Sequence, residues 1–183
     1  MAITSIPTNY GGQRFRSRLE AKWAALFDRC NWRWQYEPND YDGYIPDFCL
    51  YFRVPVLVEV KPLQWDESES DEEILQSVRT KIVHAGIKGE VLVLGTHIIP
   101  GPHPYLGMMM SVDHGTDEVS PWGFAFAFKC GNCGNHSFAN ETDSWHCRVR
   151  GCYDEENGRM HLGEWDAEQY FRRASSEVQW RPR

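Results

Sequence analysis

The segments that decide the fold are IPDF, residues 45–48, and, a short distance later, VPVLVEVKP, residues 54–62. The second is a Val-rich run typical of a strand at the centre of a sheet, and the two segments together predict a hairpin. Side chains alternate between the two faces of a strand, so Glu59 and Lys61 leave the same face while the intervening valine points to the other. The hairpin places Asp47 on the neighbouring strand. We therefore expect two carboxylates and an amine to meet near the end of an otherwise apolar sheet.

The segments on either side supply the remaining elements of an α/β core. In residues 13–30 apolar side chains recur at steps of three and four, which predicts an amphipathic helix. Aromatic and polar residues alternate in residues 31–38, as in a half-buried strand. Residues 71–86 have acids in their first turn and a terminal glycine, which predicts a second helix, and residues 89–97 read as a buried strand. The Gly and Pro residues of 100–121 predict irregular connections.

Ionisable groups beside Val-rich strands need partners, because burying an unpaired charge is unfavourable. One interpretation is a partly exposed ion pair of Glu59 and Lys61 at a sheet edge. The other is a metal site, because the carboxylates of Asp47 and Glu59 and the carbonyl of Val60 are the hard oxygen donors that Mg²⁺ or Mn²⁺ prefers. A lysine beside such a site can activate water and stabilise charge on phosphorus, which indicates phosphodiester hydrolysis.

The motifs IPDF and VEVKP, together with the preceding segment FRSRLEAKWA at residues 15–24, resemble the PD-(D/E)XK nuclease superfamily. The order of elements looks especially like the small endonucleases of the TnsA and phage-resolvase type. The resemblance spans roughly residues 10–97 and implies a restriction-endonuclease-like core, with a central mixed sheet flanked by helices. It also implies metal ligands and catalytic groups, in this chain Glu20, Asp47, Glu59, the carbonyl of Val60 and Lys61.

In this resemblance Lys61 is the catalytic lysine, and Glu20 holds a second metal or a metal-bound water. Glu20 also has a purely structural interpretation, because Ser17 and Glu20 form an S-x-x-E capping box if the helix begins at Ser17. Phe15 continues the apolar stripe in register and favours an earlier start. We therefore expect Glu20 inside the helix, near its buried face and in the catalytic site.

The C-terminal third contains a second candidate metal site. Two cysteines, Cys30 and Cys49, are isolated in apolar segments and are expected to be core thiols, whereas the other four lie close together as C-x2-C and C-x4-C: Cys130, Cys133, Cys147 and Cys152. This spacing predicts four thiolate ligands for a structural Zn²⁺ in a zinc ribbon. His136 or His146 remains an alternative to one of the four sulfurs.

These patterns divide the chain into three parts. We expect a nuclease-like core at residues 1–120, a small four-cysteine zinc-ribbon appendage at residues 121–163 and a C-terminal helix at residues 164–183. Neither a signal peptide nor an apolar run long enough to span a membrane is evident, so the expected location is the cytoplasm without membrane contact.

The net charge of −7 does not by itself suggest a nucleic-acid partner, although its distribution matters. Residues 66–73 contain six acids and no base, so the rest of the chain totals −1 (−7 minus −6). That acidic run is expected to be a solvated loop and helix start. We expect the N-terminal arginines to contact DNA phosphates, with help from two arginines of the ribbon: Arg14, Arg16 and Arg18, with Arg148 and Arg150.

The sequence therefore predicts a Mg²⁺-dependent DNA endonuclease, structure-selective and phage-associated. A chain of this size presents one site, so cleavage of both strands would require a two-fold homodimer. The alternative is a catalytically inactive protein of nuclease fold that binds a protein partner through its zinc ribbon, which suits the acidic charge.

Overall fold

The computed structural model describes residues 5–101, 103–112, 119–140, 146–153 and 162–178. In chain order its elements are β1 (Thr8–Tyr10), β2 (Gln13–Phe15), α1 (Arg18–Arg29), β3 (Trp34–Tyr36), β4 (Phe48–Leu50), β5 (Val56–Val60), α2 (Glu69–His84), β6 (Glu90–Ile99), β7 (Tyr105–Val112), β8 (Val119–Cys130), β9 (His136–Asn140), β10 (Leu162–Gly163) and α3 (Ala167–Glu177). β1 and β2 form a separate antiparallel hairpin. The other strands form one mixed sheet in the order β10-β8-β7-β6-β5-β4-β3, with β9 also paired to β8.

The predicted hairpin is confirmed by the pairing of β4 with β5, in which Phe48 lies opposite Val58 and Leu50 opposite Val56. β3 pairs antiparallel with the other edge of β4. The chain then crosses through α2 and returns as β6, which is parallel to β5. The α/β class, with a large mixed sheet flanked by helices, is therefore confirmed.

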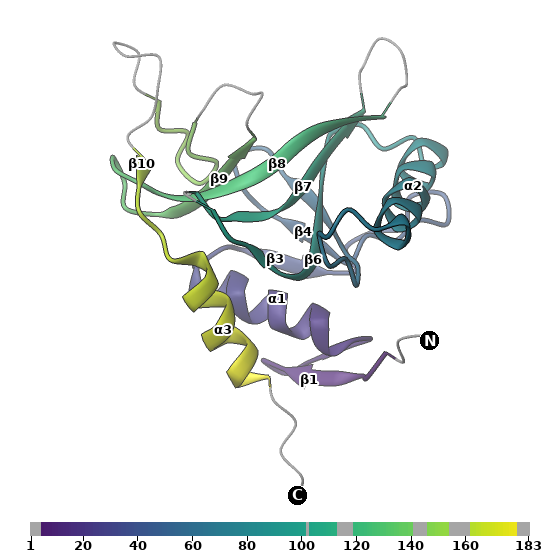
Figure 1. Cartoon of the computed structure of the whole chain (residues 1–183), viewed down its shortest axis with the longest axis horizontal. Helices are drawn as coiled ribbons and strands as arrows, with labels where there is room; N and C mark the ends of the chain where they lie inside the picture. Colours follow the sequence, from purple (N-terminus) through teal and green to yellow (C-terminus); the bar gives the residue numbers. More distant parts are fainter. Residues whose placement is uncertain (1–4, 102, 113–118, 141–145, 154–161, 179–183) are drawn as a thin grey trace, which may run out of the picture.

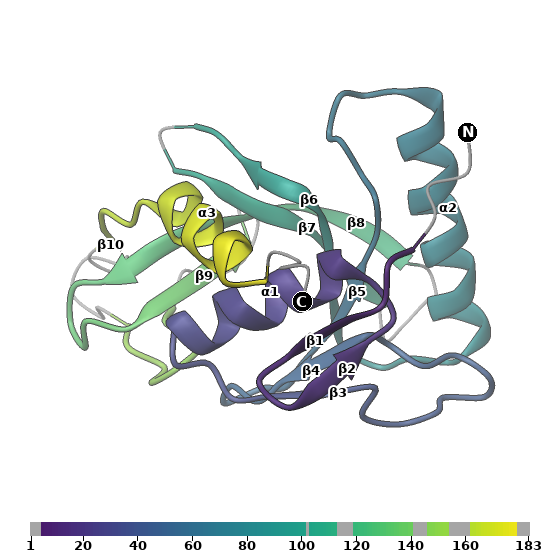
Figure 2. The ribbon, with the colours of Figure 1, turned by 90° about the horizontal axis from the view of Figure 1, so that it is seen from below.

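The helices form a layer on each face of the sheet (Figures 1 and 2). Leu92 and Leu94 of β6 point into the core shared with α1 and α3, whereas Val91 and Val93 point into the core shared with α2. This alternation is what period-two packing requires of a central strand buried on both faces. The Val-rich runs thus reflect a sheet covered on both sides.

The N-terminal helix begins later than the apolar stripe predicts. Residues 13–15 form β2, and α1 begins at Arg18, with Ser17 as its N-cap, whose Oγ accepts from the backbone N–H of Glu20 at 3.1 Å. Phe15 is fully buried, but it reaches the core from a strand. The helical spacing of Phe15 did not distinguish a helix from a strand at residues 13–15, whereas the capping box of Ser17 and Glu20 located the start of the helix.

The prediction of irregular structure over residues 100–121 is wrong, because β7 and the first three residues of β8 lie there; residues 102 and 113–118 of this stretch lie outside the described residues. Gly107 is a strand residue whose missing side chain permits close approach: a Cβ there would lie 2.0 Å from the carbonyl oxygen of Val93. Pro121 pairs with Met110 at a register shift, where a proline is tolerated in a ladder. β8 continues through Ser120, so no break in secondary structure accompanies the expected domain boundary.

Within the expected helix of residues 164–183 the structure has α3, which is shorter, and residues 179–183 lie outside the described residues. The N-cap of α3 is Asp166, whose side chain accepts from the N–H of Gln169. Trp165 and Phe171 are buried, and the ring of Phe171 lies 4.5 Å from that of Trp23 in α1. Cys30 and Cys49 are also buried, as predicted. Among the described residues, no helix has both the length and the apolar character needed to cross a bilayer.

Candidate functional site

A pocket of about 620 Å³ opens at the end of the β4–β5 hairpin. Its walls come from the N-terminal segment, from the loop before β4, from the hairpin itself and from α2: Arg16, Glu20, Asp42, Gly43, Tyr44, Ile45, Asp47, Glu59, Val60, Lys61, Thr80, Lys81 and His84. All four predicted catalytic side chains line this one pocket: Glu20, Asp47, Glu59 and Lys61.

Asp47 lies just before β4 and is almost completely buried. One carboxylate oxygen accepts from the backbone N–H of Val60 at 2.7 Å, and the other accepts from the guanidinium of Arg16 at 2.6 Å. Burial and, after it, the charge of Glu59 raise the pKa of Asp47, while the nearby Lys61 lowers it, and the net value is about 7. The carboxyl of Asp47 therefore titrates near neutral pH.

Glu59 is equally buried, and the ammonium of Lys61 pairs with its Oε1. Its Oε2 accepts from the hydroxyl of Tyr44 at 3.0 Å, and burial raises the pKa of that tyrosine above its ordinary value. The Lys61 side chain is 25% exposed, so its ammonium faces the pocket, and its Nζ lies 3.5 Å from the carbonyl oxygen of Val60. The predicted cluster of two acids and an amine is thus present in the geometry.

Glu20 is both a helix-capping residue and a pocket residue. Its Oε2 accepts from the backbone N–H of Arg16 at 3.1 Å and from the hydroxyl of Tyr36 at 2.6 Å. Burial, followed by this hydrogen bond, raises the pKa of Tyr36 to about 12. The same carboxylate closes the start of α1 and lies in the wall of the pocket, so the two interpretations of Glu20 are compatible.

The three N-terminal arginines have different environments. Arg14 is exposed on β2, and Arg18 is half-buried as the first residue of α1. The guanidinium of Arg16 lies in the pocket wall, where it pairs with Asp47 and also with Glu37 at 3.0 Å. Of these three, Arg16 is the one that lines the pocket.

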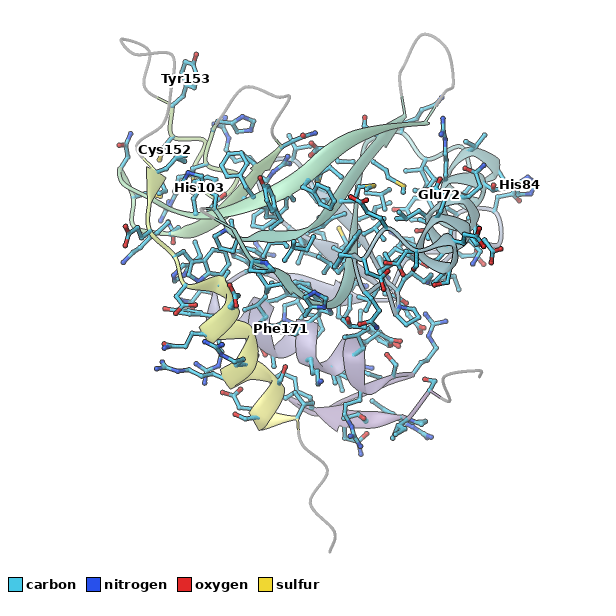
Figure 3. All side chains as sticks on the ribbon, viewed as in Figure 1. Glu72, His84, His103, Cys152, Tyr153 and Phe171 are labelled. Atoms are coloured by element: carbon cyan, nitrogen blue, oxygen red, sulfur yellow. The ribbon has the colours of Figure 1, made fainter. Side chains whose placement is uncertain are left out.

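The polar wall supplied by α2 was missed from the sequence. Thr80, Lys81 and His84 line the pocket. The sequence contains a pattern that predicts part of this wall, because residues four apart, such as Thr80 and His84, share one face of a helix. Figure 3 shows His84 at the opposite end of the molecule from Cys152 and Tyr153.

The pocket residues fit a hard divalent cation. Mg²⁺ is usually held by one or two carboxylates and keeps several waters, so Asp47, Glu59 and the carbonyl of Val60 are a sufficient donor set. Glu20 does not complete a compact cage of ligands with them. Among the described residues, three or more metal-binding side chains lie close enough to hold a single ion only at the four cysteines. The pocket thus offers donor atoms of the type that such an ion prefers, without a preformed cage of three or more side chains.

The four-cysteine site consists of Cys130, Cys133, Cys147 and Cys152, whose ligand atoms all lie within 4.8 Å of one another. Cys130 ends β8, Cys133 lies in the turn before β9, and the other two lie in a turn at residues 147–152. Gly134 has φ +72° and donates its N–H to the carbonyl of Cys130, which folds the first half around the sulfurs. Thiols so placed can hold one metal ion.

The group that could hold the ion consists of four sulfurs, because neither His136 nor His146 belongs to it. The ring of His136 instead lies 4.8 Å from the rings of Trp165 and Tyr170. Burial opposes ionisation of Cys133, but the N–H groups of Asn135 overcome it and lower the pKa of this thiol to about 7. A thiolate is therefore accessible near neutral pH, as metal binding requires.

Arg148, expected to contact phosphates, is instead a buried structural residue. Its guanidinium forms a two-point ion pair with Glu90 of β6, one contact being 2.9 Å, and its Nε donates to the carbonyl of Phe138 at 3.2 Å. The guanidinium also lies over the Phe138 ring at 4.7 Å. The acidic run is likewise not wholly solvated, because Asp71 is buried and accepts the N–H groups of Gln64 and Trp65.

The chain matches no family model, no curated protein and no solved structure. The pocket and the four-cysteine site therefore carry the functional argument.

Proposed function

We propose that this protein is a Mg²⁺-dependent endonuclease that hydrolyses phosphodiester bonds in DNA. The observation that carries the proposal is the convergence of buried Asp47 and Glu59 with the ammonium of Lys61 in one open pocket. The order α1, β3, β4, β5, α2, β6 agrees with the restriction-endonuclease-like core that the resemblance implies. This supports a PD-(D/E)XK assignment of the motifs.

The energetics of the pocket favour a functional role over a structural one. Buried Asp47 and Glu59 share the pocket with Lys61 and Arg16, and burial together with the charge of Glu59 raises the pKa of Asp47 to about 7. An arrangement that raises a carboxyl pKa by this much opposes folding at neutral pH, since the charged form must be desolvated. Perturbed groups of this kind cluster at functional sites, where a ligand or cation offsets the penalty.

Asp47, Glu59 and the carbonyl of Val60 would hold the ion. A bound Mg²⁺ would lower the pKa of water and neutralise charge on the phosphate. Lys61 is placed to donate to the non-bridging phosphate oxygens as negative charge builds on them, and its pairing with Glu59 fixes its orientation. Tyr44 and Tyr36 hold the carboxylates of Glu59 and Glu20 in place.

The four-cysteine site is proposed to bind a structural Zn²⁺ as a zinc ribbon. Four thiolates complete a tetrahedral shell and leave no open position for substrate, which is characteristic of a structural rather than a catalytic site. Cleavage of both strands of a duplex by this one-pocket chain would use a homodimer.

A second candidate is a catalytically inactive binding or adaptor protein that acts through the ribbon. The observation in its favour is Arg16, because its guanidinium already supplies a positive charge to Asp47 within the pocket. In that case the pocket would be a closed network of ion pairs. The net charge of −7 also suits a protein partner better than DNA.

Cleavage assays separate these candidates. Linear, branched and single-stranded DNA, and RNA, are incubated with the wild type and Mg²⁺ or Mn²⁺, beside Glu59→Gln and Lys61→Met, which preserve side-chain size. Arg172→Gln, an exposed α3 substitution, is the matched control. We expect each pocket variant to lower the rate by about 10²–10⁴-fold while melting curves show that it is folded at the assay temperature, and the control to match wild type. Equal activity in all four proteins would exclude the catalytic assignment.

A further inference from the structure

One face of the β3–β4 edge continues from the pocket toward the four-cysteine site. Arg33 and Gln35, two residues apart at the start of β3, lie on the same face of the strand. Glu37 donates its backbone N–H to Asp47, and Tyr51 donates its backbone N–H to Arg33, so the two strands remain in register from one end to the other. The exposed side chains Arg33, Gln35 and Tyr51 therefore extend the sheet face on which Asp47 lies.

Contacts hold this row of side chains in place. The hydroxyl of Tyr51 donates to the amide oxygen of Gln35 at 2.6 Å, and the guanidinium carbon of Arg33 lies 5.9 Å from the centre of the Tyr51 ring. Both are geometries that restrict a long side chain on a surface. Arg33 is thus an exposed cation whose position is set by its neighbours.

The cysteine turn at residues 147–152 holds a second exposed cation, Arg53. Arg53 donates its backbone N–H to the carbonyl of Arg148 at 3.2 Å, and its guanidinium crosses Gly151 so closely that a Cβ there would lie 1.9 Å from Nη1. Val54, which is 61% exposed, joins Arg53 in lining a small cavity of about 190 Å³ against the cysteine turns. Arg150 is exposed in the same turn.

The charge of this region differs from that of the whole chain. Residues 32–35, 48–57 and 146–153 contain four arginines and no acid, although the chain carries −7 overall. Since Arg148 is committed to Glu90, three guanidinium groups remain on the surface. We call Arg33, Tyr51, Arg53 and Arg150 the arginine surface. Clustered arginines beside an exposed aromatic residue suit the phosphate backbone of a nucleic acid.

We infer that the arginine surface is a second contact for the DNA that enters the pocket, and that it binds the phosphate backbone away from the scissile bond. This inference rests on the proposed function. Asp47 and Tyr51 are four strand residues apart, which is about 13 Å at ~3.3 Å per residue. The surface therefore contacts phosphates about four nucleotides from the bond in the pocket, at ~3.4 Å per nucleotide. On this account the four cysteines also serve to position Arg53 and Arg150.

The test is direct binding, measured without cleavage. Fluorescence anisotropy with a labelled 24-base-pair duplex, at several salt concentrations and without added divalent metal, compares wild type with Arg33→Gln/Arg53→Gln. The matched control is Arg172→Gln/Arg173→Gln, which removes the same charge from exposed positions of α3. Melting curves establish that both variants are folded.

We expect the surface variant to bind on the order of tenfold more weakly and to lose about two units of salt dependence, while the control stays close to wild type. Equal binding by all three proteins, or an equal loss in both variants, would overturn the inference. A wild type that binds through this surface but does not cleave in Mg²⁺ would leave the inference standing and remove the proposed function. Retained binding with lost cleavage in Glu59→Gln would support both.

Discussion

The two candidate metal sites differ in every physical property that separates a structural site from a catalytic one. The four cysteines converge within 4.8 Å and are held by tight turns, whereas the carboxylates of the pocket lie on strands around a volume of about 620 Å³. The first offers soft donors in a complete shell. The second offers hard donors, an open side and a lysine, which leaves room for water and a phosphate.

The proximity of ligand atoms does not by itself determine what chemistry a site could support. The cysteine site can do little but hold an ion, because its ligands already complete a tetrahedron. The pocket is less complete as a cage, yet it combines Asp47, whose pKa is raised, with a second buried acid, an amine and access from solvent. The stability and metal requirement of variants in the two regions test whether the cysteine site is structural and the pocket binds a functional cation.

The largest effect is expected at the cysteine site. Cys133→Ser/Cys147→Ser should remove about one zinc per chain, as measured by elemental analysis, and lower the free energy of unfolding by several kcal/mol, because structural zinc contributes folding energy directly. Asp47→Asn should retain its zinc. Protein purified without chelator that contains no zinc, or loss of zinc in Asp47→Asn, would contradict the assignment.

The buried Arg148 should come next. Arg148→Met leaves the carboxylate of Glu90 without its partner, and breaking such a pair costs about 3–5 kcal/mol, measured by urea unfolding. Arg150→Met, at an exposed position two residues away, should change stability by less than about 0.5 kcal/mol. Similar values for the two variants would mean that Arg148 is not structural.

Asp47→Asn should act in the opposite direction and stabilise the protein. The folded pKa of about 7 lies above the unfolded value of ~3.9, so folding favours the protonated acid, and wild-type stability falls as pH rises from about 4 to about 7. Asparagine removes that loss, so at pH 8 we expect a gain of ~1–3 kcal/mol that disappears at pH 4. Parallel stability profiles for the two proteins over this range would exclude a raised pKa.

The smallest effect is expected at Tyr44. Tyr44→Phe removes the hydroxyl that donates to Glu59, which costs ~1 kcal/mol of stability. The Mg²⁺ concentration required for half-maximal cleavage should rise about tenfold, because partners of this kind orient metal ligands. Tyr36→Phe, which affects Glu20 instead, should change this value less. An unchanged requirement in Tyr44→Phe would show that Tyr44 does not position Glu59.

Much of the site followed from sequence because strand alternation is a strict rule. It placed Glu59 and Lys61 on one face, and the hairpin added Asp47. Cysteine spacing predicted the second site equally well, since two short turns were enough to aim four sulfurs. These parts depend on local geometry, which a sequence displays directly.

The rest depends on contacts between distant segments, which no local pattern encodes. Tyr44 and Tyr36 reach Glu59 and Glu20 across fifteen and sixteen residues, and the Arg16 guanidinium reaches Asp47 across thirty-one. The β7 strand was missed because its glycine resembles a loop residue, when it is needed for close strand approach. Arg148 looked like a surface charge because its partner, Glu90, is fifty-eight residues away.

The path of β8 has a consequence for any attempt to separate the two ends of the molecule. This strand pairs with β7, β9 and β10 and ends at Cys130, the first of the four thiols. A truncated protein that ends at residue 120 would lack almost all of β8. Its β7 would then be a long unpaired edge strand, which promotes aggregation. The four-cysteine site therefore cannot be removed without disrupting the sheet. We expect the yield of folded protein to depend on the supply of zinc during expression.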